Sequence, residues 1–187
     1  MKKLLFAAAA AVAFVPAAYA QDTGPAGPET PTNSRIEPYV GVLGGIHNFD
    51  NEPNRAGVPA GFHGRIVEGV AGVNFNAGPL MLGVEGNATK GVDGAIDWEY
   101  GAAGRVGVRA GKDSLIFAKV GYQWVNFDAL GQNSRDYDDW TYGAGAELSL
   151  ADMGLKTDRS NLRLRVQADT YGNFHSIRPM AGLVLKY

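Results

Sequence analysis

Polar and apolar residues alternate with a period of two over the last ten residues of the chain. One set of alternate positions is wholly apolar: Pro179, Ala181, Leu183, Leu185 and Tyr187. The positions between them carry two cations and a glycine: Arg178, Met180, Gly182, Val184 and Lys186. Because successive side chains of a β-strand point to opposite faces, this stretch predicts a strand with one apolar face and one polar face.

The same pattern recurs upstream, and turn-forming residues separate one alternating segment from the next. The segments lie near residues 37–47, 65–76, 80–88, 100–110, 116–124, 142–148, 162–169 and 178–187, and the first of them alternates least clearly. A series of short alternating segments predicts an all-β chain. We predict an eight-stranded antiparallel up-and-down β-barrel that crosses a membrane.

Alternation does not decide by itself whether the apolar face points into the barrel, as in a soluble lipocalin-like protein, or out towards lipid. Three features favour lipid. Glycine is frequent on the polar face, which suits the crowded interior of an eight-stranded barrel. Longer polar links at 47–62, 89–97 and 127–140 alternate with short turns, although the link at 151–160 is long for its place. Aromatic residues of the apolar face collect at one level and predict an interfacial girdle: Trp98, Tyr100, Tyr122, Trp124, Trp140 and Tyr142.

The polar face carries most of the charged residues of the predicted strands. We place these in the lumen: Glu68, Glu85, Arg105, Arg109, Lys119, Glu147, Arg163, Arg165, Asp169, Arg178 and Lys186. Isolated buried charges are very costly, so these groups must pair with one another or keep water. We interpret them as a salt-bridge network that plugs the barrel. The alternative is a narrow ion path that prefers anions, because cations outnumber carboxylates in this set.

The first twenty residues have the pattern of a secretory signal peptide. Lys2 and Lys3 precede an apolar run, and Ala18-Tyr19-Ala20 forms a small-x-small cleavage site, so we predict a mature start at Gln21. The apolar run is short for a membrane-spanning helix. Residues 21–34 are rich in proline and glycine and predict a disordered segment, which leaves residues 35–187 for the barrel.

Candidate chemistry is sparse in this sequence. Cysteine is absent, which excludes disulfides, thiolate metal sites and a catalytic thiol, and a net charge of -2 gives no basis for binding nucleic acid. We interpret His47, His63 and His175 as rim residues, with a shared metal site as the alternative. A hydrolytic pair at His175-Ser176 lacks an acidic neighbour. We therefore expect no metal, no cofactor and no enzymatic activity.

An acidic group in the link before the sixth segment offers one further alternative. Asp136, Asp138 and Asp139 are either a solvated loop or a site that holds calcium or bridges to lipopolysaccharide through divalent cations.

The last strand resembles the C-terminal assembly signal of bacterial outer-membrane β-barrels. Gly182, Leu185 and Tyr187 match that signal, and Met180 departs from it because a polar residue is usual there. From residue 35 onward the chain resembles small barrel-only outer-membrane proteins of the OmpA/OmpX and opacity type, often called porin-family proteins.

This resemblance implies location in the outer membrane of a Gram-negative bacterium and a structural or surface-interaction role, such as envelope integrity or adhesion. The implied partners are outer-membrane lipid and lipopolysaccharide, the barrel-assembly machinery, and a host or surface ligand of the external loops. A narrow channel and a lipid-modifying enzyme are the alternatives.

Overall fold

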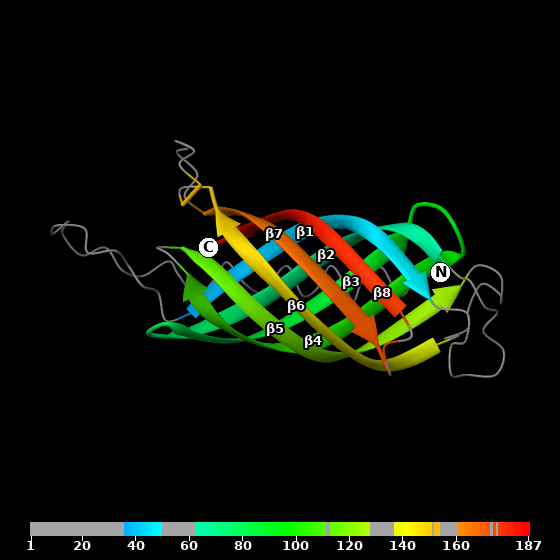
Figure 1. The fold of residues 1–187 in the computed structure, drawn as a ribbon, viewed down its shortest axis with the longest axis horizontal. Coiled ribbons are helices and arrows are strands. Elements are labelled where there is room, and N and C mark those ends of the chain that lie inside the picture. Colours follow the sequence, from blue (N-terminus) through cyan, green and yellow to red (C-terminus); the bar gives the residue numbers. More distant parts are fainter. Residues whose placement is uncertain are drawn as a thin grey trace, which may run out of the picture.

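The chain forms a closed barrel of antiparallel strands (Figure 1). The computed structural model describes residues 36–49, 63–110, 113–127, 137–150, 152–153, 161–172, 174 and 176–187. The strands are β1 (Ile36–Phe49), β2 (His63–Ala77), β3 (Leu80–Gly91), β4 (Ile96–Ala110), β5 (Ser114–Phe127), β6 (Tyr137–Ser149), β7 (Leu162–Tyr171) and β8 (Ser176–Lys186). The predicted all-β, eight-stranded, up-and-down architecture is confirmed. The predicted signal peptide and disordered segment lie outside the described residues.

Each strand pairs with its neighbours in sequence, and β8 closes the barrel against β1. In the closing pair, Val42 lies opposite Leu183 and Leu43 opposite Gly182. A Cβ at Gly182 would overlap the carbonyl oxygen of Val42 and crowd the Cα of Leu43. Glycine at this position therefore lets the first and last strands approach closely.

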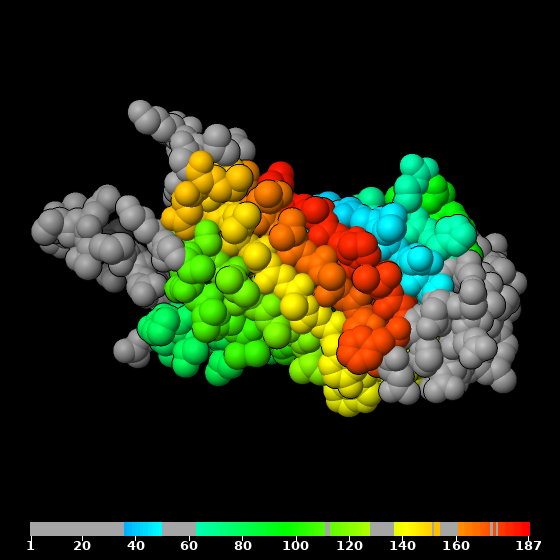
Figure 2. Space-filling model, viewed as in Figure 1, coloured from blue at the N-terminus to red at the C-terminus, as the bar shows by residue number. Residues whose placement is uncertain are grey.

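The two faces of each strand differ in burial as the alternation predicts. On β7, Val166 is 42% exposed, whereas Arg163 and Arg165 are 1% and 0% exposed. Apolar side chains elsewhere repeat this outward orientation, and Leu82 and Leu183 are 62% and 49% exposed. The apolar face is thus the outer face, which contradicts a lipocalin-like interior. Figure 2 shows β5, β6, β7, β8 and β1 side by side as diagonal bands of this outer wall.

The strands extend further than the alternating segments indicate. Pairing of β3 with β4 continues to Thr89 opposite Glu99 and Lys90 opposite Trp98. The link predicted at 89–97 is therefore mostly strand, and only Val92–Ala95 connects β3 to β4. Hydrogen bonding to a neighbouring strand continues after apolar alternation has ended, because the backbone supplies it independently of side chains.

The connections divide between two ends of the barrel. At the turn end lie the C-terminus, the β4–β5 and β6–β7 connections and the tight β2–β3 turn, in which Gly78 has a φ of 62° (Figure 1). The other end, here called the loop end, carries the β1–β2, β3–β4, β5–β6 and β7–β8 connections. In the described part of the chain, no helix has the length and apolar character needed to cross a membrane.

Candidate functional site: an ionic interior and its loop-end rim

The inner face of the barrel carries all eleven charged residues that the sequence analysis assigned to the lumen. Most are almost completely buried, including Glu68, Arg165 and Arg178 at 0% exposure. Each of the cations has a carboxylate within 4.0 Å. An eight-stranded barrel is just wide enough for side chains to fill it, so these groups are pressed together.

The turn end of the interior holds the first cluster of ion pairs. Glu37 lies 3.1 Å from both Arg109 and Arg163, so the first strand is tied to β4 and β7. Lys186 of β8 lies 2.7 Å from Asp113, which precedes β5. The cluster therefore joins strands that are far apart in the sequence.

The middle of the interior holds a second cluster, in which two carboxylates sit among arginines. Glu147 lies 2.7 Å from both Arg105 and Arg165 and 3.1 Å from Arg163. Glu85 contacts Arg165 and Arg105 on its other side. Arg163 reaches down to the turn-end cluster, so the two clusters are continuous.

Nearer the loop end, Arg178 is the centre of a third cluster. Its guanidinium lies 2.9 Å from Glu68, 2.7 Å from Glu99 and 3.0 Å from Asp169. Lys119 lies 2.9 Å from Asp169 and 3.6 Å from Glu85, which connects this cluster to the middle one. The ion pairs thus form one ladder along the barrel axis.

The ladder is balanced in charge, in contrast to the cationic excess expected from sequence. Three carboxylates were not assigned to it in advance, namely Glu37, Glu99 and Asp113. With them, the carboxylates are Glu37, Glu68, Glu85, Glu99, Asp113, Glu147 and Asp169, which equal in number the cations Arg105, Arg109, Lys119, Arg163, Arg165, Arg178 and Lys186. The electrostatic basis for anion preference is therefore removed.

An aromatic cluster, here called the aromatic cap, lies inside the barrel above the ladder at the loop end. Phe49, Phe127, Tyr137 and Tyr171 are each no more than 3% exposed and pack together, with the Phe49 ring 5.3 Å from that of Phe127 and 5.8 Å from that of Tyr137. This aromatic cap was not predicted from the sequence, although Phe49, Phe127 and Tyr171 occupy the alternate positions that point to the inner face. Aromatic rings packed edge to face exclude water from the space they fill.

The histidines do not converge on one site. His47 is buried inside the barrel, where its ring stacks on Tyr171 at 4.9 Å, so the prediction of a rim residue is wrong for this position. His63 is exposed at the start of β2, and His175 lies outside the described residues. His47 Nδ1 contacts Glu99, and its Nε2 lies 3.2 Å from Ser176 Oγ.

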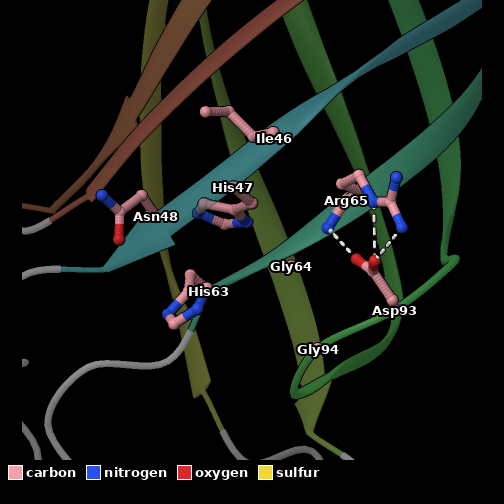
Figure 3. A pocket seen from close by; sticks show the side chains of 8 residues that line it. All are labelled: Ile46, His47, Asn48, His63, Gly64, Arg65, Asp93 and Gly94. Carbon is pink, nitrogen blue, oxygen red and sulfur yellow. Dashed lines mark hydrogen bonds and ion pairs between the residues drawn. The ribbon is translucent and has the colours of Figure 1, made fainter.

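A pocket of about 650 Å³ opens at the loop end over β1 and β2 (Figure 3). Ile46, His47 and Asn48 line it from β1, and His63, Gly64 and Arg65 line it from β2. Asp93 and Gly94 of the β3–β4 link complete the lining, and the Arg65 backbone and side chain donate to Asp93. These hydrogen bonds lower the pKa of Asp93 from its usual value, so its exposed carboxylate is charged at neutral pH.

The aromatic residues predicted as a girdle lie together on the outer face of β4, β5 and β6. Tyr100 stacks on Trp124 at 5.4 Å, and Tyr122 meets Trp140 edge to face at 5.9 Å. Trp98 and Tyr142 are 48% and 43% exposed on the same outer face.

The acidic residues expected in the preceding link belong partly to a strand. Asp138 and Asp139 lie in β6, where Tyr122 donates to Asp138 and the Trp140 backbone donates to Asp139. Asp136 lies outside the described residues.

The residues matched to an assembly signal occupy the last strand at the turn end. Gly182 faces inward against β1, Leu185 lies on the outer face, and Tyr187 is 64% exposed. The Tyr187 backbone N–H donates to the carbonyl of Pro38 at 2.9 Å, which fastens the C-terminal residue to the first strand.

Comparison with solved structures finds several similar chains. Neisserial surface protein A matches with a TM-score of 0.52 and 12% identity, over 82% of this chain and 98% of that one. The attachment invasion locus protein Ail of Yersinia pestis matches with a TM-score of 0.47 and 13% identity, over 81% of this chain and 96% of that one. A de novo designed transmembrane β-barrel matches with a TM-score of 0.49 and 16% identity, over 80% and 95% of the two chains.

Comparison with curated protein sequences finds no match. A family model, described as the outer membrane protein beta-barrel domain, matches residues 5–175 and so spans most of the chain. The inward charges, the outward apolar face and the closed antiparallel topology are those expected of such a domain. The chain belongs to the outer-membrane β-barrel family.

Proposed function

We propose that this outer-membrane barrel has a structural and surface-interaction role and that its lumen does not conduct solutes across the membrane. The observation that carries the proposal is the filled interior, in which a balanced ion ladder lies beneath an aromatic cap. Fixed charges held this tightly rigidify the wall, since every strand contributes to the ladder or to the cap. The loop end then faces the exterior, as long connections do in this class of barrel.

Conductance across a planar lipid bilayer tests the closed lumen. We expect the full chain to give no reproducible single-channel openings. Shortening the cap by Phe49→Ala together with Phe127→Ala should leave the ladder in place and still give no steady current. Reproducible openings of the unaltered chain would contradict the proposal.

A narrow ion path is the second candidate function. Several buried polar atoms have no hydrogen-bond partner within the described residues, including Arg105 Nε, Gln123 Nε2 and Asp169 Oδ1. Water along the axis would satisfy such atoms and favour slow conduction. If this function holds, openings should be present in the unaltered chain and lost on Arg105→Leu.

The proposed partners follow from the outer surface. The apolar outer face suits acyl chains, and the last strand suits the barrel-assembly machinery. His63, Arg65 and Lys90 lie at the loop end with exposed side chains, where they suit anionic groups of lipopolysaccharide.

Outer-membrane fractionation with heat-modifiable gel mobility tests insertion, and the N-terminal sequence of the inserted protein tests cleavage before Gln21.

A surface ligand would meet the connections at the loop end. Phe174 in the β7–β8 connection is 77% exposed and has a φ of 66°, a backbone conformation that is uncommon for a bulky residue. Phe174→Ser should weaken adhesion of expressing cells to a ligand-coated surface without lowering the amount of inserted barrel. Unchanged adhesion would remove this residue from the proposed contact.

A further inference from the structure

Three residues beside the aromatic cap have the connectivity of a nucleophile, a base and a residue that orients the base. His47 Nδ1 contacts the Glu99 carboxylate, and His47 Nε2 lies 3.2 Å from Ser176 Oγ. When Nδ1–H donates to Glu99, Nε2 accepts the Ser176 hydroxyl proton, which is the polarity that an activated serine requires.

The histidine is held firmly in this orientation. Its ring stacks on Tyr171 at 4.9 Å and lies 4.2 Å from the ring of Phe49. Glu99 is fixed in turn by Arg178 at 2.7 Å and by the Tyr171 hydroxyl at 3.4 Å. Packing and hydrogen bonds of this kind give a reactive group a defined geometry before any substrate binds.

A cationic side chain with one unpaired N–H group lies on the same strand face as Ser176. Arg178 follows Ser176 by two residues on the inner side of β8. Its Nε is buried and has no hydrogen-bond partner within the described residues. A preorganised cationic donor stabilises the oxyanion formed when an ester carbonyl is attacked.

The barrel wall is interrupted next to this group. Pairing of β1 with β8 runs from Tyr39 opposite Lys186 to Gly45 opposite Met180, and it resumes only at Asn48 opposite Ile177. Pro179 lies in this interval of β8 and has no backbone N–H to donate to a hydrogen bond with β1. Strands β1 and β8 are therefore less tightly joined beside His47 than along the rest of their pairing.

The loop-end pocket meets the wall at the same place. Ile46, His47 and Asn48 line it, and in Figure 3 Ile46 and His47 project from β1 in opposite directions. Its exposed lining combines the apolar Ile46 with the polar His63 and Arg65. A pocket with this lining at a membrane interface suits a molecule that has both an acyl chain and an anionic head group.

We propose that Ser176, His47 and Glu99 form an acyl-transfer site that cleaves a carboxylic ester of an outer-leaflet lipid entering from the loop-end pocket. This activity goes beyond the structural and surface-interaction role proposed above. Ser176 and His47 are the catalytic residues, and Glu99 is a positioning residue that acts through His47.

The reaction balances with the lipid ester and water as reactants. Ser176 Oγ bonds to the ester carbonyl carbon as His47 Nε2 takes the hydroxyl proton. The bond from that carbon to the alcohol oxygen then breaks, and His47 returns the proton to the leaving alcohol. Water, deprotonated by His47, attacks the acyl-serine, releases the fatty acid and restores the Ser176 hydroxyl.

A fluorophosphonate probe tests the nucleophile in the full chain inserted into phospholipid vesicles. Intact mass should show one adduct, on Ser176, and Ser176→Ala should abolish it. Ser149→Ala is the matched control, because Ser149 is a buried inward serine at the turn end of the barrel. His47→Gln should slow labelling about 100-fold or more. Glu99→Gln should slow it as well, whereas Glu99→Asp should retain part of the rate.

The labelling rate of each variant is measured only on the protein that runs as a folded, heat-modifiable band on a gel. If the folded chain is labelled no faster than Ser176→Ala, or if Ser149→Ala removes the adduct, the proposal is overturned. Ser176→Ala removes a single oxygen atom, so its comparison with the unaltered chain holds even if the His47 variant does not fold.

Release of fatty acid identifies the ester. Vesicles of phosphatidylethanolamine and vesicles that contain lipopolysaccharide are offered separately, with a soluble nitrophenyl ester as a third substrate. Release from either lipid that is lost in Ser176→Ala supports the proposal and assigns the source. Cleavage of the soluble ester alone would overturn the assignment to lipid.

Discussion

Removing the charge of Glu147 tests whether the ion ladder holds the barrel together. Glu147→Gln keeps the size of the side chain and one acceptor oxygen but abolishes its negative charge. Three buried arginines depend on that charge: Arg105 and Arg165 at 2.7 Å and Arg163 at 3.1 Å. Their exposures are 3%, 0% and 1%, so water cannot replace the lost carboxylate without opening the wall.

The expected loss follows from this geometry. Removing one partner of a buried ion pair costs about 3 to 5 kcal/mol, because an uncompensated charge is left inside. Glu85 still neutralises part of the cluster through Arg105 and Arg165, so we expect the lower half of that range. Urea unfolding in lipid vesicles measures the free energy, with tryptophan fluorescence and the folded gel band as independent probes.

Asp93→Asn is the matched control for this change. It also removes a carboxylate from an arginine pair, but Arg65 and Asp93 are 72% and 44% exposed at the loop end. Exposed ion pairs contribute little, so the urea midpoint should not move measurably. Adding Arg105→Met to Glu147→Gln removes a cation that has lost the nearer of its two carboxylate partners. The double variant should therefore lose less stability than the sum of the two single changes.

A Glu147→Gln barrel as stable as the unaltered one would refute the reasoning. That result would mean that water already hydrates the arginines in the lumen and that the ladder contributes no net stability.

Three further predictions concern the wall. Val166→Arg places a cation on the outer face, where Val166 is 42% exposed, and should cost about 2 to 4 kcal/mol in vesicle unfolding, with Val166→Leu as the neutral control. Gly182→Val should sharply reduce the folded gel band, because its side chain would overlap the Val42 carbonyl, and normal folding would contradict the close approach of β1 and β8. All three tryptophans of the chain lie in the girdle. Lipids brominated near the head group should therefore quench tryptophan fluorescence far more than lipids brominated at the ends of their acyl chains. Equal quenching by the two lipids would contradict a common depth of the tryptophans near the head groups.

The alternation of inward and outward positions along each strand accounts for most of what could be predicted from the sequence. Arg163 and Arg165 alternate with Leu164 and Val166, and burial of the two sets follows the alternation without exception along β7. The pattern is reliable because a shift by one residue would move two arginines into hydrocarbon.

The interior was predicted less completely because it depends on the ends of strands. Glu37 and Glu99 occupy alternate positions that point inward, but each lies near a strand end, where the alternation of polar and apolar residues is weak. A register irregularity between Ile96 and Trp98 turns Ile96 inward against the alternation of β4, whereas Glu99 keeps the inward position that the alternation gives it. A parity count extended to every strand end would have found Glu37, Phe49 and Phe127.

The contact of His47 with Glu99 and Ser176 could not be predicted from spacing. The three residues come from β1, β4 and β8, and only closure of the barrel brings them together. The sequence places His175 next to Ser176, but adjacent residues of a strand face opposite ways, so a pair of these two was not expected.

The partners of Glu37 affect the order of assembly. This residue enters with the first strand, yet Arg163 and Lys186 arrive only with the last two. A sheet of fewer strands would leave its ionic side open and unneutralised, and such a sheet could not be released into hydrocarbon. The final strands therefore pair the remaining charges of the interior and close the wall in one event. Insertion of this barrel should be all-or-none.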